Sequence, residues 1–295
     1  KVALAYHASK GDGQKTKFIG REKGYHGVNF GGVSVGGLTP NRKSFGPLLP
    51  GIDHMPHTWS PEDMAFSKGQ PEWGLHLAED LEKILVLQDP STVAAVIIEP
   101  VTGSGGVIVP PVGYLERIRE ICTKHDVLLI FDEVITAFGR LGDSFAANRF
   151  NVRPDIITMA KGLTSAVIPM SAVAFDTTIY DQLMKGPEAM IELFHGYTYS
   201  GHPVACAAGI ATLDVYQEEG LFDKAKELEP IFEEALHSLK GLNQVIDIRN
   251  IGLMGAVQFG PGKLPATEFA ANVFQHCYDN DVLVRYSGEF LVLSP

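Results

Sequence analysis

The feature that most constrains the fold is an alternation of short apolar runs with longer amphipathic stretches in the middle of the chain. The apolar runs lie at residues 93–99, 127–131 and 156–160, and amphipathic stretches at residues 114–124 and 144–149 separate them. Runs that are apolar at nearly every position are typical of strands covered on both faces, and helical connections between them favour a parallel sheet. The alternation therefore predicts an α/β domain with a mainly parallel sheet.

The pattern changes from His202 onward. A run of small residues at 203–211 and a helical stretch at 221–239 lead away from the sheet. After them we expect strands at residues 245–249 and 253–259, a helix at 267–278, and short strands at 282–285 and 290–293. This order is typical of an α+β segment. We therefore predict a large α/β domain at residues 1–215 and a small α+β domain at residues 216–295.

Charge and hydropathy argue against several classes of partner. With 35 acidic and 24 basic residues, the chain has a formal net charge of −11, which disfavours nucleic acid and anionic membranes. We find no apolar run near the roughly 18 residues of a membrane span and no basic leader, so we expect a cytoplasmic protein. His54 and His57 have no further ligands close to them in the sequence, so we expect a polar loop there and no metal site.

Ionisable side chains end two of the expected strands. Asp132 and Glu133 directly follow the apolar residues 128–131, so they should point to opposite sides of the strand end. Lys161 ends the next strand. Because ligands bind at the carboxyl ends of strands in open α/β sheets, Asp132 and Lys161 can face one site. On spacing alone, a structural ion pair at the sheet edge is an equal alternative.

Five motifs occur in a fixed order along the chain. They are YHG at 25–27, EPVTGSGG at 99–106, DEVITAFGRLG at 132–142, DIITMAKGL at 155–163 and HGYTYSGHP at 195–203. Together they resemble the class III aminotransferases of the fold type I pyridoxal-phosphate enzymes, over nearly the whole chain. Within the class, EPVTGSGG, GYHGVNFGG and HGYTYSGHP are most similar to the omega-amino acid:pyruvate branch, whose members use beta-alanine-like donors.

The resemblance implies pyridoxal 5'-phosphate as cofactor, with Lys161 and Asp132 as the catalytic residues. A lysine amine can form a Schiff base with the cofactor aldehyde and can then carry a proton between substrate and cofactor. A carboxylate beside the pyridine nitrogen keeps that nitrogen protonated, so that the ring withdraws electrons. Lys161 takes the first role and Asp132 takes the second.

Other residues receive roles by the same resemblance. Val134, on the same side of the strand as Asp132, is expected on one face of the cofactor ring, and Tyr25 on the other. His26 orients the cofactor or Asp132, with a supporting structural role as an equal alternative. Thr198 is similar to the family threonine that binds the cofactor phosphate of the partner subunit. This implies a homodimer, or a higher homo-oligomer, with active sites at the interface.

Substrate binding is expected at Arg285 and Glu99. Arg285, in VLVRYSGE, matches the family arginine that binds a substrate carboxylate, a task suited to a planar bidentate donor. A surface arginine near a strand end is its alternative. Glu99 closes a buried strand just before Pro100, which makes it a pocket-wall residue without assigned chemistry.

The expected reaction moves an amino group from an omega-amino acid or amine to pyruvate or a similar keto acid. Two alternatives stay open. One is another class III reaction, such as that of a 2,1-aminomutase or a decarboxylating transaminase. The other is a truncated, catalytically impaired dimerisation module, because the resemblance implies that the chain begins after the family's phosphate-binding loop and stops before its terminal helix.

Overall fold

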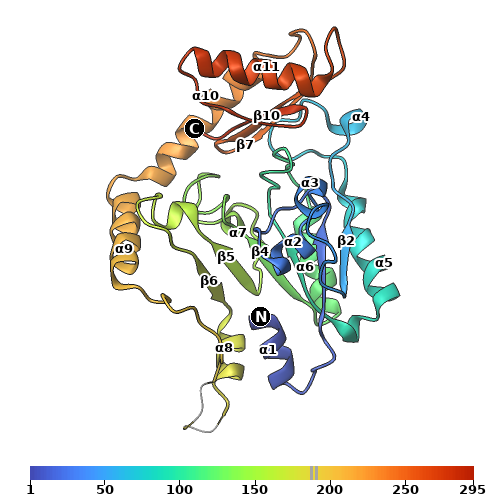
Figure 1. The fold of residues 1–295 in the computed structure, drawn as a ribbon, viewed down its shortest axis with the longest axis vertical. Coiled ribbons are helices and arrows are strands. Elements are labelled where there is room, and N and C mark those ends of the chain that lie inside the picture. The colour runs from blue at the N-terminus through green and yellow to red at the C-terminus, as the bar shows by residue number, and fades with distance from the viewer. Residues whose placement is uncertain (187–188, 190–191) are drawn as a thin grey trace.

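The large sheet has six strands in the order β2-β1-β3-β4-β5-β6. The computed structural model describes residues 1–186, 189 and 192–295 (Figure 1). Neighbouring strands are parallel except β6, which runs antiparallel to β5. The strands are β1 (Lys17–Arg21), β2 (Ile52–Met55), β3 (Val93–Ile98), β4 (Leu128–Asp132), β5 (Ile156–Met159) and β6 (Ala172–Phe175). The predicted α/β domain with a mainly parallel sheet is confirmed.

Helices cover both faces of this sheet. Helices α5 (Glu79–Gln88) and α6 (Tyr114–Lys124) bury Leu85 and Ile118 against Leu129 of β4. Helices α1 (Val2–Ser9) and α8 (Thr177–Leu183) pack with Ile130 on the opposite face. Successive strand residues face opposite sides of the sheet, so a strand covered on both faces needs apolar residues on both sides. All five residues of β4 are buried accordingly.

The amphipathic pattern of α6 determines which of its faces is buried. Leu115, Ile118 and Ile121 recur at helical spacing and are fully buried, while Glu120 faces outward in an ion pair with Arg117. Each buried aliphatic side chain of this kind contributes about 1.5–3 kcal/mol relative to an exposed one.

The remaining helices and 3-10 turns around the large sheet are α2 (Phe30–Val35), α3 (Thr39–Arg42), α4 (Pro61–Met64), η1 (Leu75–Ala78), η2 (Pro90–Thr92), α7 (Ala146–Arg149) and η3 (Lys161–Leu163).

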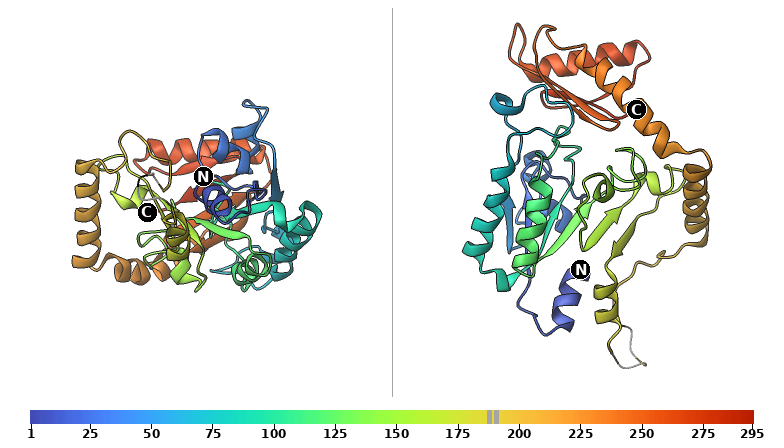
Figure 2. Two further views of the ribbon diagram at one scale, coloured as in Figure 1. Left: turned by 90° about the horizontal axis from the view of Figure 1, so that it is seen from below. Right: turned by 180° about the vertical axis from the view of Figure 1, so that it is seen from behind.

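The C-terminal part forms a second, antiparallel sheet of order β7-β8-β10-β9. Helices α10 (Leu221–His237) and α11 (Ala266–Asp279) pack on it, and α9 (Pro203–Glu218) lies at the outer edge of the molecule, in contact with α10 and η3 (Figures 1 and 2). The strands are β7 (Val245–Ile251), β8 (Met254–Phe259), β9 (Arg285–Ser287) and β10 (Phe290–Leu293). The expected division between residues 215 and 216 falls within α9 and stays a prediction.

Two sequence expectations about strands need correction. The short strand expected at residues 282–285 is found at Arg285–Ser287, because the turn through Gly288 pairs Ser287 with Phe290 and thereby sets the register. Strands β1, β2 and β6 were not expected. Strands β2 and β6 form the two edges of the sheet, and β6 is the antiparallel strand of this mainly parallel sheet.

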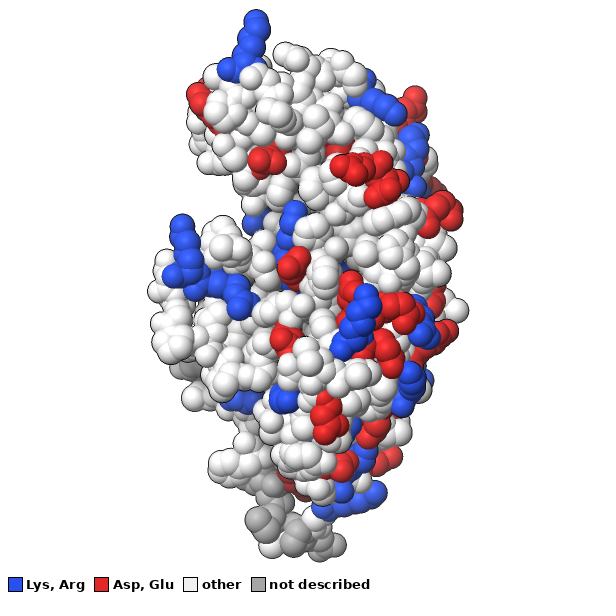
Figure 3. Space-filling view, turned by 90° about the vertical axis from the view of Figure 1, so that its right-hand side faces the viewer, with Lys and Arg blue, Asp and Glu red and all other residues white. Residues whose placement is uncertain are grey.

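Two features are absent from the part of the chain that the structure describes. No helix among them is long and apolar enough to cross a membrane. Within the same residues, no three His, Cys, Asp or Glu side chains are grouped as metal ligands would be. Figure 3 shows acidic and basic side chains interspersed over one face of the molecule.

Candidate active site

Asp132, the last residue of β4, is held by both of its carboxylate oxygens. His26, in the loop after β1, donates from Nδ1 to Oδ2 of Asp132 at 2.8 Å, and the backbone N–H of Val134 donates to Oδ1 at 3.2 Å. Both side chains of the His26–Asp132 pair are almost inaccessible to solvent. The hydrogen bond therefore fixes the orientation of the carboxylate at the end of the strand.

Glu133 points to the other side of the strand end, as predicted. It is fully buried, and its carboxylate accepts hydrogen bonds from the backbone N–H groups of Ala146 and Ala147 and from the hydroxyl of Thr136. Burial raises the pKa of Glu133, and the two backbone donors oppose that shift. Glu133 thus anchors the first turn of α7, and with it the loop between β4 and α7.

Lys161 follows β5, the strand beside β4, and has the left-handed φ of 46°. Its side chain is exposed to a cavity of about 570 Å³. Partial desolvation lowers the pKa of Lys161, and the positive charge of Arg285 lowers it further, while the carboxylates of Asp132 and Glu99 raise it. The net lowering makes the neutral, nucleophilic amine more abundant at physiological pH.

The cavity around Lys161 gathers cations from three regions of the chain. Its lining includes Val134, Phe138, Arg140, Lys161, Tyr216 and Arg285. Among the described residues that line it, three carry a positive charge and none carries a negative one. Such a lining favours an anionic ligand. Two predicted site residues from distant motifs, Lys161 and Arg285, are therefore brought to one cavity.

Glu99 connects the loops on either side of the site. Its Oε1 accepts a hydrogen bond from the backbone N–H of Tyr25 and its Oε2 accepts one from Gly103, each at 2.9 Å. Burial raises the pKa of Glu99, whereas the charge on His26 and the two backbone donors lower it. Glu99 does not line the cavity, and its role in substrate binding stays a prediction.

The other predicted site residues differ in their placement. Tyr25 is half-buried in the loop after β1. Val134 lines the cavity from a turn, because β4 ends at Asp132, so the expectation that it lies on the strand is wrong. Thr198 is exposed in the segment before α9 and does not line the cavity. The roles of these residues toward the cofactor stay predictions.

Sequence reasoning did not single out several residues that line this cavity or contact its lining. The hydroxyl of Tyr216, on α9, donates to the carbonyl of Gly162 at 2.6 Å, and its ring stacks near Phe138. Ser104 lies 3.4 Å from Nη1 of Arg285. Phe138 and Ser104 fall within recognised motifs and were accessible from the sequence, but Tyr216 lies in no motif.

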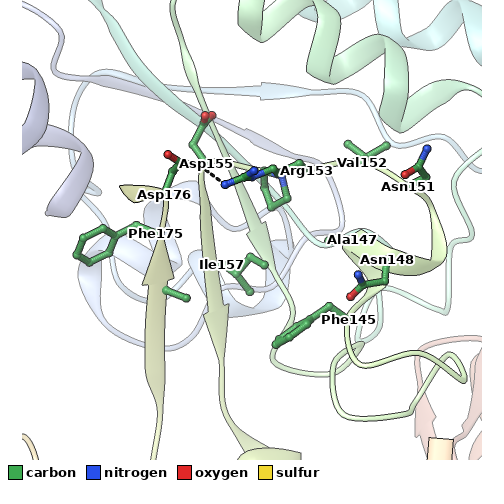
Figure 4. A pocket seen from close by; sticks show the side chains of 12 residues that line it. Phe145, Ala147, Asn148, Asn151, Val152, Arg153, Asp155, Ile157, Phe175 and Asp176 are labelled. Carbon is green, nitrogen blue, oxygen red and sulfur yellow. Dashed lines mark hydrogen bonds and ion pairs between the residues drawn. The ribbon is translucent and has the colours of Figure 1, made fainter. Parts of the chain in front are cut away.

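A second cavity, of about 470 Å³, lies at the opposite end of β5 (Figure 4). Its charged side chains are already engaged: Arg153 pairs with Asp176, and Asp155 pairs with Arg119. Asp155 also accepts from the backbone N–H of Leu129 at 2.6 Å. This cavity lies at the amino end of the strand. The cavity beside Lys161 is the better candidate, because its lysine and two arginines form no ion pair with any residue that the structure describes.

Pyridoxal 5'-phosphate fits the residues around the first cavity. Lys161 offers an amine with a lowered pKa for the aldehyde carbon, and Asp132 offers a carboxylate that His26 holds in place for the pyridine nitrogen. The cavity volume lies within the range of small-molecule sites.

Known proteins share this fold over the whole chain. An amine transaminase from an uncultivated Pseudomonas species, solved in its PLP-bound form, superimposes with a TM-score of 0.92 at 37% identity, covering 100% of this chain and 68% of that one. An (S)-enantioselective omega-transaminase from Thermomicrobium roseum gives a TM-score of 0.91 at 33% identity, with coverages of 100% and 66%. Fold and site thus define a pyridoxal-phosphate enzyme of fold type I.

Sequence comparison gives the family. The model of the class-III aminotransferases matches residues 1–294, and the chain belongs to this family. An omega-aminotransferase of Caulobacter vibrioides is 57% identical over 295 residues, covering 100% of this chain and 67% of that protein. A beta-alanine–pyruvate aminotransferase of Pseudomonas aeruginosa is 50% identical over 298 residues, covering 100% and 66%. The chain spans about two thirds of the length of these relatives. The predicted family and cofactor are confirmed.

Proposed function

We propose that the protein transfers an amino group from an omega-amino acid or amine, such as beta-alanine, to pyruvate or a similar keto acid. The observation that carries the proposal is the single cavity that contains Lys161 and Arg285, beside the oriented carboxylate of Asp132. The names of the relatives, omega-aminotransferase and beta-alanine–pyruvate aminotransferase, support the same donor and acceptor classes.

Each residue then has a defined task. When bound, the cofactor supplies an electron-withdrawing ring that lowers the barrier to removing a proton from the substrate. Lys161 would hold the cofactor through its Nζ and would carry that proton. Asp132, oriented by His26, keeps the pyridine nitrogen protonated. Val134 and Tyr25 would hold the ring between them, one on each face.

Arg285 binds the carboxylate shared by beta-alanine and pyruvate. It has no ion-pair partner among the described residues, and its one side-chain hydrogen bond, to the hydroxyl of Ser104, is long at 3.4 Å, so its guanidinium can take a bidentate anion. Glu99, behind the cavity, holds the loops of Tyr25 and Gly103 in place, and we propose it as a residue of the substrate pocket wall.

A homodimer completes the proposal. Exposed apolar side chains gather on α9 and in the segment before it, including Phe194, Tyr199 and Ile210, and α9 lies at the outer edge of the molecule (Figure 2). A surface of this kind marks an interaction site. Thr198 is exposed in the same segment, and we propose that it binds the cofactor phosphate of a partner subunit. A cytoplasmic location stays a prediction from composition.

The test is a panel of donors with pyruvate, read by the formation of alanine. Beta-alanine, taurine and 1-phenylethylamine are donors with a carboxylate, with a sulfonate and with no acidic group. Lys161→Ala should abolish the visible absorption band of the lysine-bound cofactor and reduce turnover by about 10³-fold or more, because a residue that acts covalently is removed. Lys83→Ala, at an exposed lysine of α5, is the matched control and should change neither.

Three outcomes would contradict the proposal. A retained absorption band in Lys161→Ala would remove the lysine assignment. Amino migration or release of carbon dioxide without alanine would favour the aminomutase or decarboxylating alternative. Cofactor binding without reaction of any donor would favour an impaired dimerisation module.

A further inference from the structure

Arg249, on β7, is a buried arginine with every guanidinium nitrogen engaged. Its Nε donates to the carbonyl of Gly106 at 2.7 Å, its Nη1 pairs with Asp247, and its Nη2 donates to Oε1 of Gln258 at 3.2 Å. Its guanidinium also lies 5.1 Å from the ring centre of Trp59. A buried charge is tolerated only with such complete pairing, and the planar fork fixes the direction of each bond.

The same cluster joins the small sheet to a distant segment of the large domain. Asp247 is buried and accepts hydrogen bonds from Nε1 of Trp59 at 3.0 Å and from the backbone N–H of Phe66 at 2.6 Å. Gly69 then donates to the carbonyl of Asn250 at the edge of β7. Helix α4, within this segment, lies beside the small sheet in both views (Figures 1 and 2).

The loop that Arg249 holds also reaches the substrate cavity. At its start, Gly103 donates to Glu99, and Ser104 lies 3.4 Å from Nη1 of Arg285. At its end, Gly106 is packed so closely that an added Cβ would lie 2.9 Å from Nη2 of Arg249. The loop therefore runs between the two sheets with fixed contacts at both ends.

We propose that Arg249 is a positioning residue for substrate binding, acting through the loop at residues 103–106 on Arg285. The inference rests on the proposed function. Arg249 does not line the cavity; it fixes the loop against β7, and the loop in turn limits where the guanidinium of Arg285 lies relative to Lys161. Substrates that carry a carboxylate depend on that separation, whereas uncharged amines do not.

Arg249→Lys in the complete protein tests the proposal, because an ammonium keeps the charge but cannot serve three partners in one plane. In single half-reactions followed by cofactor absorbance, the KM for beta-alanine should rise by about 10- to 100-fold, the scale expected when a reacting group is misplaced by about 1 Å. The KM for 1-phenylethylamine should change by less than about threefold, since that amine has no carboxylate to align. Hydrogen exchange of residues 103–107 should be faster in the variant.

Three further variants complete the design. Arg285→Ala gives the loss expected when the carboxylate site is removed outright. Trp59→Phe keeps an aromatic ring beside Arg249 but removes the donor to Asp247, so it should reproduce the selective effect more weakly if Arg249→Lys does not fold. Arg149→Met breaks a different pair, between α7 and Glu229 of α10, and should alter neither the beta-alanine preference nor the loop exchange.

The outcomes separate this inference from the proposed function. Equal losses for both donor classes, or unchanged exchange of the loop, would overturn the role of Arg249. If the unmodified protein reacts with neither donor, the proposed function fails, and the exchange measurement alone decides whether Arg249 fixes the loop: faster exchange supports the inference and unchanged exchange overturns it.

Discussion

At the scale of single residues, the charges around Lys161 act on its amine in opposite directions. The carboxylates of Asp132 and Glu99 stabilise the ammonium form and raise the pKa, while partial desolvation and the guanidinium of Arg285 favour the neutral form and lower it. The pH at which the Lys161 amine becomes reactive therefore depends on the charges of these neighbouring groups.

Two substitutions should therefore move the pKa of Lys161 in opposite directions. Asp132→Asn removes a charge that raises it, so the amine should become reactive at lower pH than in the unmodified protein. Arg285→Ala removes a charge that lowers it, so reactivity should require higher pH. The measurement is the pH dependence of Lys161 acylation in cofactor-free protein, followed by mass spectrometry. Shifts of the same sign in both variants would show that the charges do not act on the amine as inferred.

The sequence predicted the parts of the site that depend on strand ends. Asp132 and Lys161 lie at the same edge of the sheet because neighbouring parallel strands present their carboxyl ends there, and the charge of Asp132 acts on the Lys161 amine. The position of Val134 could not be predicted as well, because where a strand ends depends on its hydrogen-bond partners. Tyr216 and Arg249 could not be predicted either. Each contacts the site region through a hydrogen bond to a residue more than fifty positions away in the sequence, and no local sequence pattern records such a contact.

At the scale of elements, α7 is anchored by a carboxylate outside the helix, that of the residue directly after β4. Glu133 accepts from two backbone N–H groups at the start of this four-residue helix, which is too short to be stable alone. The loop between Glu133 and α7 supplies Val134 and Phe138 to the cavity.

Glu133→Ala should therefore destabilise the protein by about 1–3 kcal/mol for each backbone donor left unpaired. Denaturant unfolding of cofactor-free protein measures this change. Glu120→Ala, at an exposed glutamate of α6 that also forms an ion pair, is the control and should leave the unfolding midpoint almost unchanged. An equal effect of the two substitutions would mean that Glu133 does not anchor the loop.

The success of sequence reasoning varied among elements for a physical reason. Helix α6 and strand β3 were predicted almost to the residue, because one buried stripe or a doubly buried strand leaves an unambiguous pattern. Strand β6 left none, because it lies at the sheet edge with two of its four residues exposed. Edge strands are defined by pairing with a neighbour, which no local pattern records.

At the scale of the whole molecule, the exposed apolar face of α9 has a testable consequence for assembly. The complete protein should sediment at twice the mass of one chain, and replacing Ile210 in the variant Ile210→Glu should shift it toward the monomer, because a buried, unpaired charge opposes association. Leu87→Glu, at an exposed leucine of α5 away from this face, is the matched control. A monomeric unmodified protein, or equal effects of both variants, would contradict the dimer.

The segment around Lys68 also bears on how the chain is made. Lys68 forms a bridge with Asn250 at the outer edge of β7, so the covering segment precedes the strand by 250 − 68 = 182 residues. During synthesis, this cover leaves the ribosome long before the strand does. A newly made β7 can then be paired as soon as it emerges, which shortens the time in which its open edge is available to other nascent chains.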